Sequence, residues 1–327
     1  MDFKFKTAVL TGATGVLGSA LLNKLVENGI NVYVVCHVGS QRNKQILNNP
    51  LLHKIDCNLE NINELPELIH EKIDVFYHFA WLGTQVNSNR LNMYLQLDNI
   101  KYALDAVKAS SALGVKVFIG AGSQAEFGRV NGVLRPDTPV NPISGYGMAK
   151  LCAGQMTRFL CHEFGIKQIW PRVVSTYGPH DAKKTLISVV IDKLLNNERP
   201  SLTKGEQIWD YLFAEDAAEA FFRMATKGKD GAVYVLGSGE PHPLKEFMYA
   251  IRDAINSSAE LGIGEIPYLP DQAMHLEADI TSLKEDLNWS PTTNFQTGIK
   301  KTIEWYKAMK GMNCENKKNQ RQFTSIY

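Results

Sequence analysis

Three glycines spaced three residues apart follow the first apolar run of the chain, in the segment TGATGVLGSALL from Thr11 to Leu22. The run Thr7–Leu10 has the composition of a buried strand, and the residues after Gly15 have the apolar spacing of a helix. Glycine adopts backbone conformations closed to other residues and allows a close approach. Because free N–H groups at a helix start attract phosphate, Gly12, Gly15 and Gly18 predict a dinucleotide-binding turn.

This spacing differs from the usual Gly-x-Gly-x-x-Gly pattern, so a purely structural turn is the alternative. Further short apolar runs alternate with longer helical patterns, which favours the first interpretation. The expected strands are TAVL, NVYVVC, LLHKID, IDVFYHFA, VKVFIG and KQIWPRVV, and the expected helices are Gly15–Glu27, Asn92–Leu113 and Tyr146–Glu163. Apolar strands separated by helices predict an α/β fold, a Rossmann-like doubly wound parallel sheet covered on both faces.

The rhythm of the pattern changes after about residue 175. A helix near Thr185–Asn196 is followed by IWDYLFAEDAAEAFFRMA, a strand AVYVLGS, and helices near Leu244–Asn256 and Phe295–Met309. We expect a dinucleotide-binding Rossmann domain at 1–175, to which the chain returns around 205–240. A smaller α/β substrate lobe is expected at 176–309, and a polar, loosely ordered tail at 310–327.

Composition limits the classes of partner. A formal net charge of +1 gives no electrostatic case for nucleic acid or an anionic membrane surface. No apolar stretch approaches the roughly 20 residues that a spanning helix needs, and the start lacks a signal peptide. The chain has no Cys-x-x-Cys pair, so we expect free thiols and a cytoplasmic protein. We also expect no metal site. The five cysteines are Cys36, Cys57, Cys152, Cys161 and Cys314.

The end of the second expected strand bears on the choice of cofactor. An acidic residue there usually holds the ribose 2′-hydroxyl of NAD, but this chain has Cys36 and His37. The missing acid, with Arg42 nearby, favours NADP over NAD. Alternatively, Arg42 is a solvated loop residue and His37 is a surface or packing residue. Asp56 could accept from the adenine amino group or simply end its strand.

Tyr146 and Lys150 lie four residues apart in SGYGMAK, a spacing that places both on one helix face. A free tyrosine has a pKa of about 10, and we expect Lys150 and an oxidised nicotinamide to lower it. Ser123, in the upstream turn GAGSQAEFG, could hold the substrate oxygen on which Tyr146 acts. Alternatively, it is an ordinary residue of a glycine-rich turn.

These motifs together resemble the extended short-chain dehydrogenases/reductases, in the NAD-dependent epimerase/dehydratase group that acts on nucleotide sugars. The resemblance covers residues 5 to 308 and continues through RVVSTYGP, WDYLFAEDAAEA and ADITSLKEDLNWSPTTNFQTGIKKTIEWY. It implies Ser123, Tyr146 and Lys150 as the catalytic set. It implies cofactor contacts at Gly12, Thr14, Gly15, Val16, Leu17, Gly18, His37, Arg42, Asp56, Cys57, Phe79, Ala80, Trp81, Asn99, Lys150, Arg172 and Ser175. Substrate contacts are expected at Gln85, Ser123, Gln124, Tyr146, Tyr177, Leu186 and Trp209.

Departures from the family pattern narrow the expected reaction. The similar 4,6-dehydratases have Thr-Asp-Glu where this chain has Ser123, Gln124 and Ala125, so dehydration is not expected. Trp209 replaces an arginine that often contacts the nucleotide. The leading hypothesis is an NADP-dependent reductase of the C4 ketone of an NDP-4-keto-6-deoxy sugar; a 4-epimerase with bound NAD and a non-catalytic dinucleotide sensor are the alternatives. Family members often dimerise through two helices of each subunit, so a homodimer is possible through Asn92–Leu113 and Leu151–Phe164.

Overall fold

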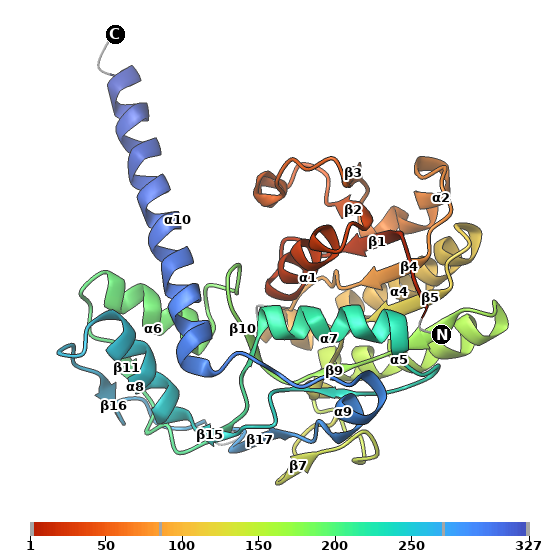
Figure 1. The fold of residues 1–327 in the computed structure, drawn as a ribbon. Helices are drawn as coiled ribbons and strands as arrows, with labels where there is room; N and C mark the ends of the chain where they lie inside the picture. Colours follow the sequence, from red (N-terminus) through yellow and green to blue (C-terminus); the bar gives the residue numbers. More distant parts are fainter. Residues whose placement is uncertain (1–2, 85–86, 270–271, 325–327) are drawn as a thin grey trace.

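The computed structural model describes residues 3–84, 87–269 and 272–324. At its centre lies a six-stranded parallel sheet in the order β3-β2-β1-β4-β5-β8 (Figure 1). Its strands are β1 Thr7–Thr11, β2 Asn31–Cys36, β3 Leu52–Asp56, β4 Val75–His78, β5 Val117–Gly120 and β8 Lys167–Ile169. Parallel pairing in this order is the doubly wound arrangement, so the predicted fold class is confirmed.

The strand order reverses between β1 and β4, which are paired with each other at the middle of the sheet. The chain leaves β1 toward β2 on one side and returns through β4 to β5 on the other. A crevice opens at the carboxyl ends of the strands at such a reversal. The Thr11 hydroxyl oxygen accepts the N–H groups of Phe79 and Ala80, both at 3.0 Å, and so ties the ends of β1 and β4 together.

Helices cover both faces of this sheet (Figure 1). On one face α1 Val16–Glu27 packs beside α7 Ala214–Lys227, and their apolar residues join the largest core cluster. On the other face α4 Met93–Ala112 packs beside α5 Gly145–Glu163. The predicted helices near α1, α4 and α5 agree with these bounds within one or two residues, because each has a clear apolar stripe.

The smaller lobe is built around α6 Leu186–Leu195, α8 Leu244–Ile255 and α10 Phe295–Thr324. Their apolar faces share one core cluster with Tyr177 and Phe213. In Figure 1 this lobe lies beside the parallel sheet, and α10 projects away from it. Within the lobe β12 Ile208–Trp209 lies between β15 His242–Pro243 and β17 His275–Ala278.

Shorter elements connect these parts. They are η1 Gln41–Gln45, η2 Leu59–Glu64, α2 Leu65–Leu68, α3 Asn87–Leu91, β6 Gly122–Ser123, η3 Gln124–Glu126, β7 Val133–Leu134, β9 Arg172–Val173, β10 Thr176–Tyr177, β11 Ser201–Leu202, β13 Leu212–Phe213, β14 Val235–Leu236, β16 Gly262–Ile263 and α9 Thr281–Leu287. Of these, β6, β9 and β14 form a three-stranded sheet.

One expectation about local structure was wrong. The run KQIWPRVV is not one strand: it divides into β8 and β9, which belong to different sheets, and Pro171 between them has no N–H to donate to a ladder. The expected polar tail at 310–327 overlaps α10, which continues to Thr324, and its loose order stays a prediction. After Gly311 this stretch has no glycine or proline and is rich in Lys, Gln and Asn, so its backbone can remain helical without an apolar stripe.

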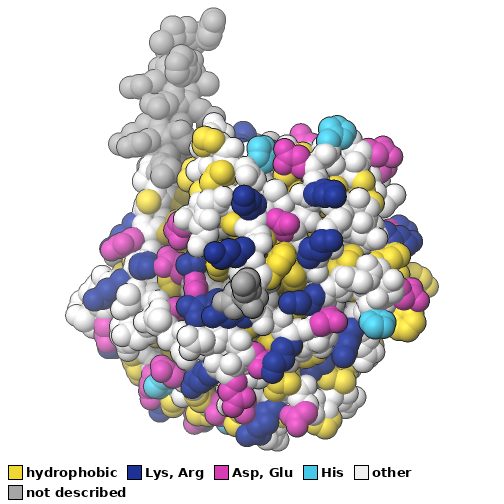
Figure 2. All heavy atoms as spheres, turned by 45° about the vertical axis from the view of Figure 1, so that its right-hand side comes forward, with side chains coloured by type: hydrophobic (Ala, Val, Ile, Leu, Met, Phe, Trp, Pro, Cys, Tyr) yellow, Lys and Arg dark blue, Asp and Glu magenta, His cyan; other side chains and the backbone are white. Residues whose placement is uncertain are grey.

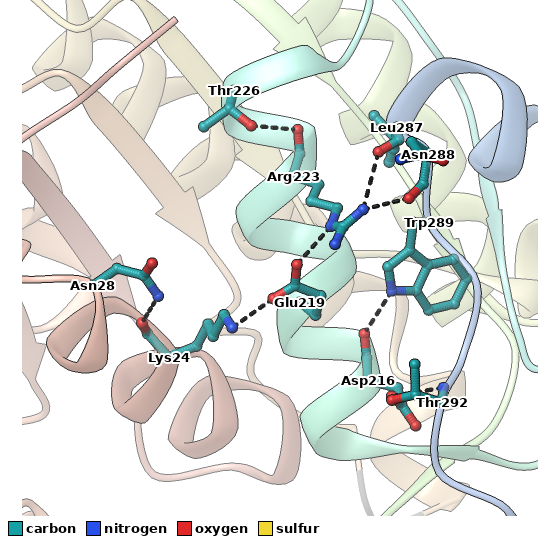
Figure 3. Close-up of polar contacts among 10 residues, drawn as sticks. All are labelled: Lys24, Asn28, Asp216, Glu219, Arg223, Thr226, Leu287, Asn288, Trp289 and Thr292. Atoms are coloured by element: carbon teal, nitrogen blue, oxygen red, sulfur yellow. Dashed lines mark hydrogen bonds and ion pairs between the residues drawn. The ribbon is translucent and has the colours of Figure 1, made fainter. Parts of the chain in front are cut away.

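A polar network fastens the segment after α9 to the helices of the parallel sheet (Figure 3). Glu219 on α7 accepts from Lys24 on α1 and from Arg223, each at 2.5 Å. The Arg223 guanidinium in turn donates to the carbonyl oxygens of Leu287 and Asn288 at the end of α9. The buried Trp289 ring follows directly and donates to the Asp216 carbonyl oxygen at 3.2 Å. The late segment is thereby held against α7.

Both signs of charge are interspersed on the face shown in Figure 2, where Lys and Arg gather near the centre with Asp and Glu among them. Among the described residues, no helix has the length and apolar character needed to cross a membrane. The cysteines whose side chains are described, Cys36, Cys57, Cys152 and Cys161, are free thiols. Cys314 lies outside that set.

Candidate active site

The glycine turn opens a cavity of about 630 Å³ at the carboxyl ends of β1 and β4. Gly12 has a φ of +76°, and a Cβ there would lie 2.8 Å from the Ala80 nitrogen. Gly15 caps α1 without a side-chain hydrogen bond, so the first N–H groups of α1 are free to face the cavity. A Cβ at Gly18 would collide with the Gly12 carbonyl. The turn therefore fits the pyrophosphate of a dinucleotide.

The predicted cofactor residues divide into those that line this cavity and those that do not. The lining includes Gly12, Thr14, Gly15, Val16, Leu17, Gly18, His37, Arg42, Cys57, Phe79, Ala80, Trp81 and Lys150. Four others, Asp56, Asn99, Arg172 and Ser175, are not among the lining residues. Asp56 is exposed at the end of β3, where it fits the strand-end alternative.

The adenosine end of the cavity is formed by the loop after β2. Cys36 is 3% exposed, whereas His37 lines the cavity together with Arg42 and Asn43. One Arg42 nitrogen donates to the Thr14 carbonyl oxygen at 2.6 Å, which anchors this loop to the glycine turn. Of the two positions proposed for the missing acid, His37 is therefore the one that a bound ribose would meet.

A second loop, after β10, forms the opposite wall of this end. His180 has a φ of 65°, a left-handed conformation that is uncommon for a residue with a side chain. Its ring nitrogen Nδ1 lies 3.1 Å from the Gln45 side-chain oxygen of η1, and its ring lies 4.8 Å from that of Trp305 on α10. The η1 loop and the β10 loop are thus connected beside the cavity.

The expected catalytic set converges at the other end of the cavity, where Ser123, Tyr146 and Lys150 all contribute to the lining. Ser123 ends β6, and Tyr146 and Lys150 lie in the first turns of α5, whose N-cap Ser144 accepts from the Gly147 N–H. Ser123 hydrogen-bonds to Tyr146, which favours the phenolate. The burial of Tyr146 outweighs this contact and raises the pKa of its phenol above the ordinary value.

Lys150 contacts three groups at this end of the cavity. Its Nζ donates to the Ala121 carbonyl oxygen at 2.7 Å, lies 3.7 Å from the centre of the Trp81 ring and lies 5.8 Å from that of Tyr146. Burial lowers the pKa of Lys150 to about 7. The expectation that Lys150 and an oxidised nicotinamide together lower the pKa of Tyr146 stays a prediction.

Sequence reasoning missed a second cation at this end. Arg90, on the short helix α3, lines the cavity, and its Cζ lies 4.2 Å from the centre of the Tyr146 ring. Its charge favours the phenolate of Tyr146 and so opposes the effect of burial on the pKa. No motif marked Arg90, since it comes from an irregular connection after β4.

A buried ion pair, also missed, supports Ser123 from behind. Glu126 is 1% exposed and accepts the Ser123 N–H at 2.8 Å and the Trp170 ring N–H at 3.0 Å through one oxygen. Its other oxygen accepts from Arg172 at 2.8 Å. Arg172 was expected to contact the cofactor, but it is 7% exposed and is held by Glu126 and by the Phe127 ring. Because a buried charge needs a partner, Arg172 serves the pair instead.

The remaining predicted residues have structural partners. Asn99 is 1% exposed. Its side-chain oxygen accepts from the Leu82 backbone N–H at 2.8 Å, and its side-chain nitrogen donates to the Leu82 carbonyl oxygen at 3.0 Å. It thereby shapes the loop that carries Trp81. Ser175 accepts from the Trp209 ring N–H at 3.0 Å.

Among the expected substrate residues that the structure describes, Ser123 and Tyr146 alone line the cavity. Tyr177 is 1% exposed and packs against Phe213 and Phe295. Leu186 begins α6, Gln124 begins η3, and neither is among the lining residues. Gln85 lies outside the described residues. His78, at the end of β4, is 2% exposed, and burial together with Lys150 lowers its pKa to about 3.

Comparison with known proteins gives one family. The model of the NAD dependent epimerase/dehydratase family matches residues 8–237. The dTDP-D-glucose 4,6-dehydratase of Mus musculus is 26% identical over 96% of this chain and 91% of its own. A putative UDP-glucose 4-epimerase of Methanocaldococcus jannaschii is 26% identical over 91% and 98%. The match to the dTDP-glucose 4,6-dehydratase of Xanthomonas campestris spans 52% of that enzyme.

Solved structures share the fold. The UDP-glucose 4-epimerase of Thermotoga maritima, solved with UDP-glucose, superposes with a TM-score of 0.82 at 23% identity, over 93% of this chain and 99% of the other. The UDP-glucuronic acid 4-epimerase of Bacillus cereus, solved with UDP-glucuronic acid and NAD, also gives 0.82, at 20% identity over 93% and 99%.

Proposed function

Because the chain belongs to the NAD-dependent epimerase/dehydratase family, as expected from its motifs, we propose that it catalyses hydride and proton exchange at C4 of a nucleotide sugar. The observation that carries the proposal is the convergence of Ser123, Tyr146 and Lys150 on the cavity that the glycine turn opens. A bound nicotinamide supplies the hydride chemistry. The protein supplies the glycine turn for the pyrophosphate, Ser123 for the C4 oxygen, and Tyr146 for the proton.

The protonation state of Tyr146 suits the donation of a proton to a ketone oxygen. Burial raises the pKa of this phenol, so the group is neutral at physiological pH. Ser123, fixed through its backbone N–H by Glu126, can orient the substrate oxygen toward the phenol. General acid catalysis of this kind is typically worth 10²–10⁴ in rate.

Dehydration finds no support in the site. Gln124 and Ala125 stand where the similar dehydratases have an acid and a base, and neither lines the cavity. A substrate that already contains a ketone is the natural partner for a site that can deliver one hydride and one proton. The first candidate is therefore reduction of the C4 ketone of an NDP-4-keto-6-deoxy sugar.

A 4-epimerase that retains its cofactor is the second candidate. It uses the same three residues and is favoured by the contact between His180 and Gln45, which joins the two loops beside the adenosine end and would slow cofactor exchange.

The protein should be incubated with dTDP-, CDP- and GDP-4-keto-6-deoxyhexoses plus NADPH, and separately with UDP-hexoses without added cofactor. NADPH oxidation with a product two hydrogens heavier supports the reductase. If only a UDP-hexose reacts, by inversion at C4, the reductase proposal fails.

The Tyr146→Phe variant tests the shared part of both candidates. It keeps the ring packing against Trp81 and Arg90 and removes the proton. Turnover should fall by about 10²–10⁴, while cofactor affinity stays near that of the wild type. Turnover equal to that of the wild type would remove Tyr146 from the mechanism.

We further propose NADP as the preferred cofactor, supported by His37 and Arg42 at the adenosine end of the cavity. The residue to exchange is His37, since Cys36 is buried. A carboxylate in His37→Asp would repel a 2′-phosphate and accept from a 2′-hydroxyl, so binding titrations should show NADPH favoured by the wild type and NADH by the variant. A wild type that prefers NADH tenfold would contradict this proposal.

We also propose a homodimer through α4 and α5. These adjacent helices expose Tyr94 (82%), Leu97 (57%) and Phe159 (68%), more apolar surface than a solvated helix pair usually presents. Sedimentation of the wild type should show a dimer, and Phe159→Glu should shift it toward monomer. Wild-type monomer at micromolar concentration would refute this assembly.

A further inference from the structure

Arg90 is an unusual neighbour for a phenol that must exchange a proton. Its guanidinium carbon lies 4.2 Å from the centre of the Tyr146 ring, at the wall of the cavity. Within the described part of the chain, no carboxylate forms an ion pair with Arg90, whereas Arg172, Arg199, Arg223 and Arg252 each have one. Its charge is therefore directed at Tyr146 and the cavity.

The fold builds this placement at Gly145, the residue before Tyr146. A Cβ there would lie 3.2 Å from the Arg90 carbonyl oxygen and 2.8 Å from the Met93 sulfur. The carbonyl distance is tighter than an ordinary contact, whereas the Met93 side chain could turn away. Glycine at position 145 therefore eases the close approach of α3 to the first turn of α5, which places Arg90 next to Tyr146.

Lys150 is turned toward other partners. Its Nζ donates to the Ala121 carbonyl oxygen and lies over the Trp81 ring, farther from Tyr146 than the Arg90 guanidinium is. Burial lowers the pKa of Lys150. An arginine keeps its charge at every pH near neutrality.

We propose that Arg90 is a second cation, beside Lys150, that stabilises the phenolate of Tyr146, as a positioning residue that acts through Tyr146. The groups that face the phenol are Ser123 from β6, Glu126 from η3, Arg90 from α3 and Lys150 from α5 itself. Among them, Ser123 and Arg90 lower the pKa of Tyr146 and Glu126 raises it, against the larger effect of burial. The inference rests on the proposed function, in which Tyr146 exchanges the proton.

A direct test is the titration of Tyr146 in the full chain, labelled with ¹³C at the tyrosine Cζ and observed by NMR with oxidised cofactor bound. Tyr146→Phe identifies the signal. In Arg90→Met the titration midpoint should rise by about one pH unit, because an opposite charge at this distance is lost. Arg90→Lys should restore most of the difference. Arg158→Met, which removes a cation twelve residues along α5, about 18 Å from Tyr146, is the matched control and should leave the midpoint unchanged.

An unchanged midpoint in Arg90→Met, or an equal shift in Arg158→Met, would overturn the inference. With an active substrate in hand, the pH profile of kcat/KM should move in the same direction in Arg90→Met. A rise in KM alone, with the profile unmoved, would show that Arg90 binds substrate instead and would also overturn it. Full activity of Tyr146→Phe would refute the proposed function itself, so the two failures are distinguishable.

Discussion

Replacing Glu126 with glutamine tests whether the buried ion pair behind Ser123 is charged and structurally required. Glu126→Gln preserves side-chain length, and its amide oxygen can still accept from Ser123 and Trp170. Its amide nitrogen would face the Arg172 guanidinium, which is 2.8 Å from the carboxylate in the wild type. One buried cation would then have no partner.

The expected loss follows from the burial of both side chains, 1% exposed for Glu126 and 9% for Arg172. Breaking such a pair from one side typically costs about 3–5 kcal/mol of unfolding free energy. With an unfolding entropy of about 2.1 cal/mol/K per residue, this loss lowers the Tm of a 327-residue chain by about 4–7 °C.

The assay is thermal and urea unfolding of matched variants. Glu126→Gln combined with Arg172→Met removes both charges and should recover most of the stability, because an apolar pair of similar size is often as stable as a buried ion pair. Glu215→Gln breaks the pair with Lys301, whose two side chains are about half exposed, and should cost less than about 1 kcal/mol. A Tm of Glu126→Gln within about 1 °C of the wild type would refute the reasoning.

Two further predictions concern the cavity. Gly18→Ala places a methyl group against the Gly12 carbonyl and should abolish dinucleotide binding measured by titration, whereas Gly311→Ala, also within a helix and where a Cβ meets nothing, should retain it. Burial raises the pKa of Asp181 to about 6. The protonated carboxyl therefore stabilises the folded protein relative to the ionised one, and this contribution to the free energy of unfolding is lost as pH rises through 6. Asp181→Asn should therefore be more stable than the wild type by roughly 1–3 kcal/mol at pH 8, with the difference vanishing toward pH 4 in urea unfolding; a constant difference would contradict this origin.

The sequence predicts the parallel sheet and its main helices well because each has a regular apolar pattern. The glycine turn was equally accessible, since Gly12 and Gly18 are required by close backbone approaches that few other arrangements need. Ser123, Tyr146 and Lys150 were predictable because two of them share one helix face and the third lies in a glycine-rich turn that follows β5.

What the sequence did not predict depends on three-dimensional neighbours of irregular segments. Arg90 comes from a five-residue helix, and its distance from Tyr146 is set by contacts with α5. Arg172 follows a family pattern, but its role depends on Glu126, which has no marking motif. The effect of burial on the pKa of Tyr146 is not visible in a spacing of four residues.

The network around Asp216 and Glu219 has a consequence for how the protein is made. Asp216 accepts from Thr292 and Thr293, and Glu219 pairs with Lys24, so α1 is linked through α7 to residues near the end of the chain. During synthesis, α1 would emerge long before α7 can cover the face of the sheet that they share. A nascent chain of 175 residues would expose that apolar face and leave β9 without its partner β14. The parallel sheet therefore gains its α7 layer, and β9 its partner β14, only after residue 236 has been made, and a chain shorter than this exposes apolar surface that favours aggregation.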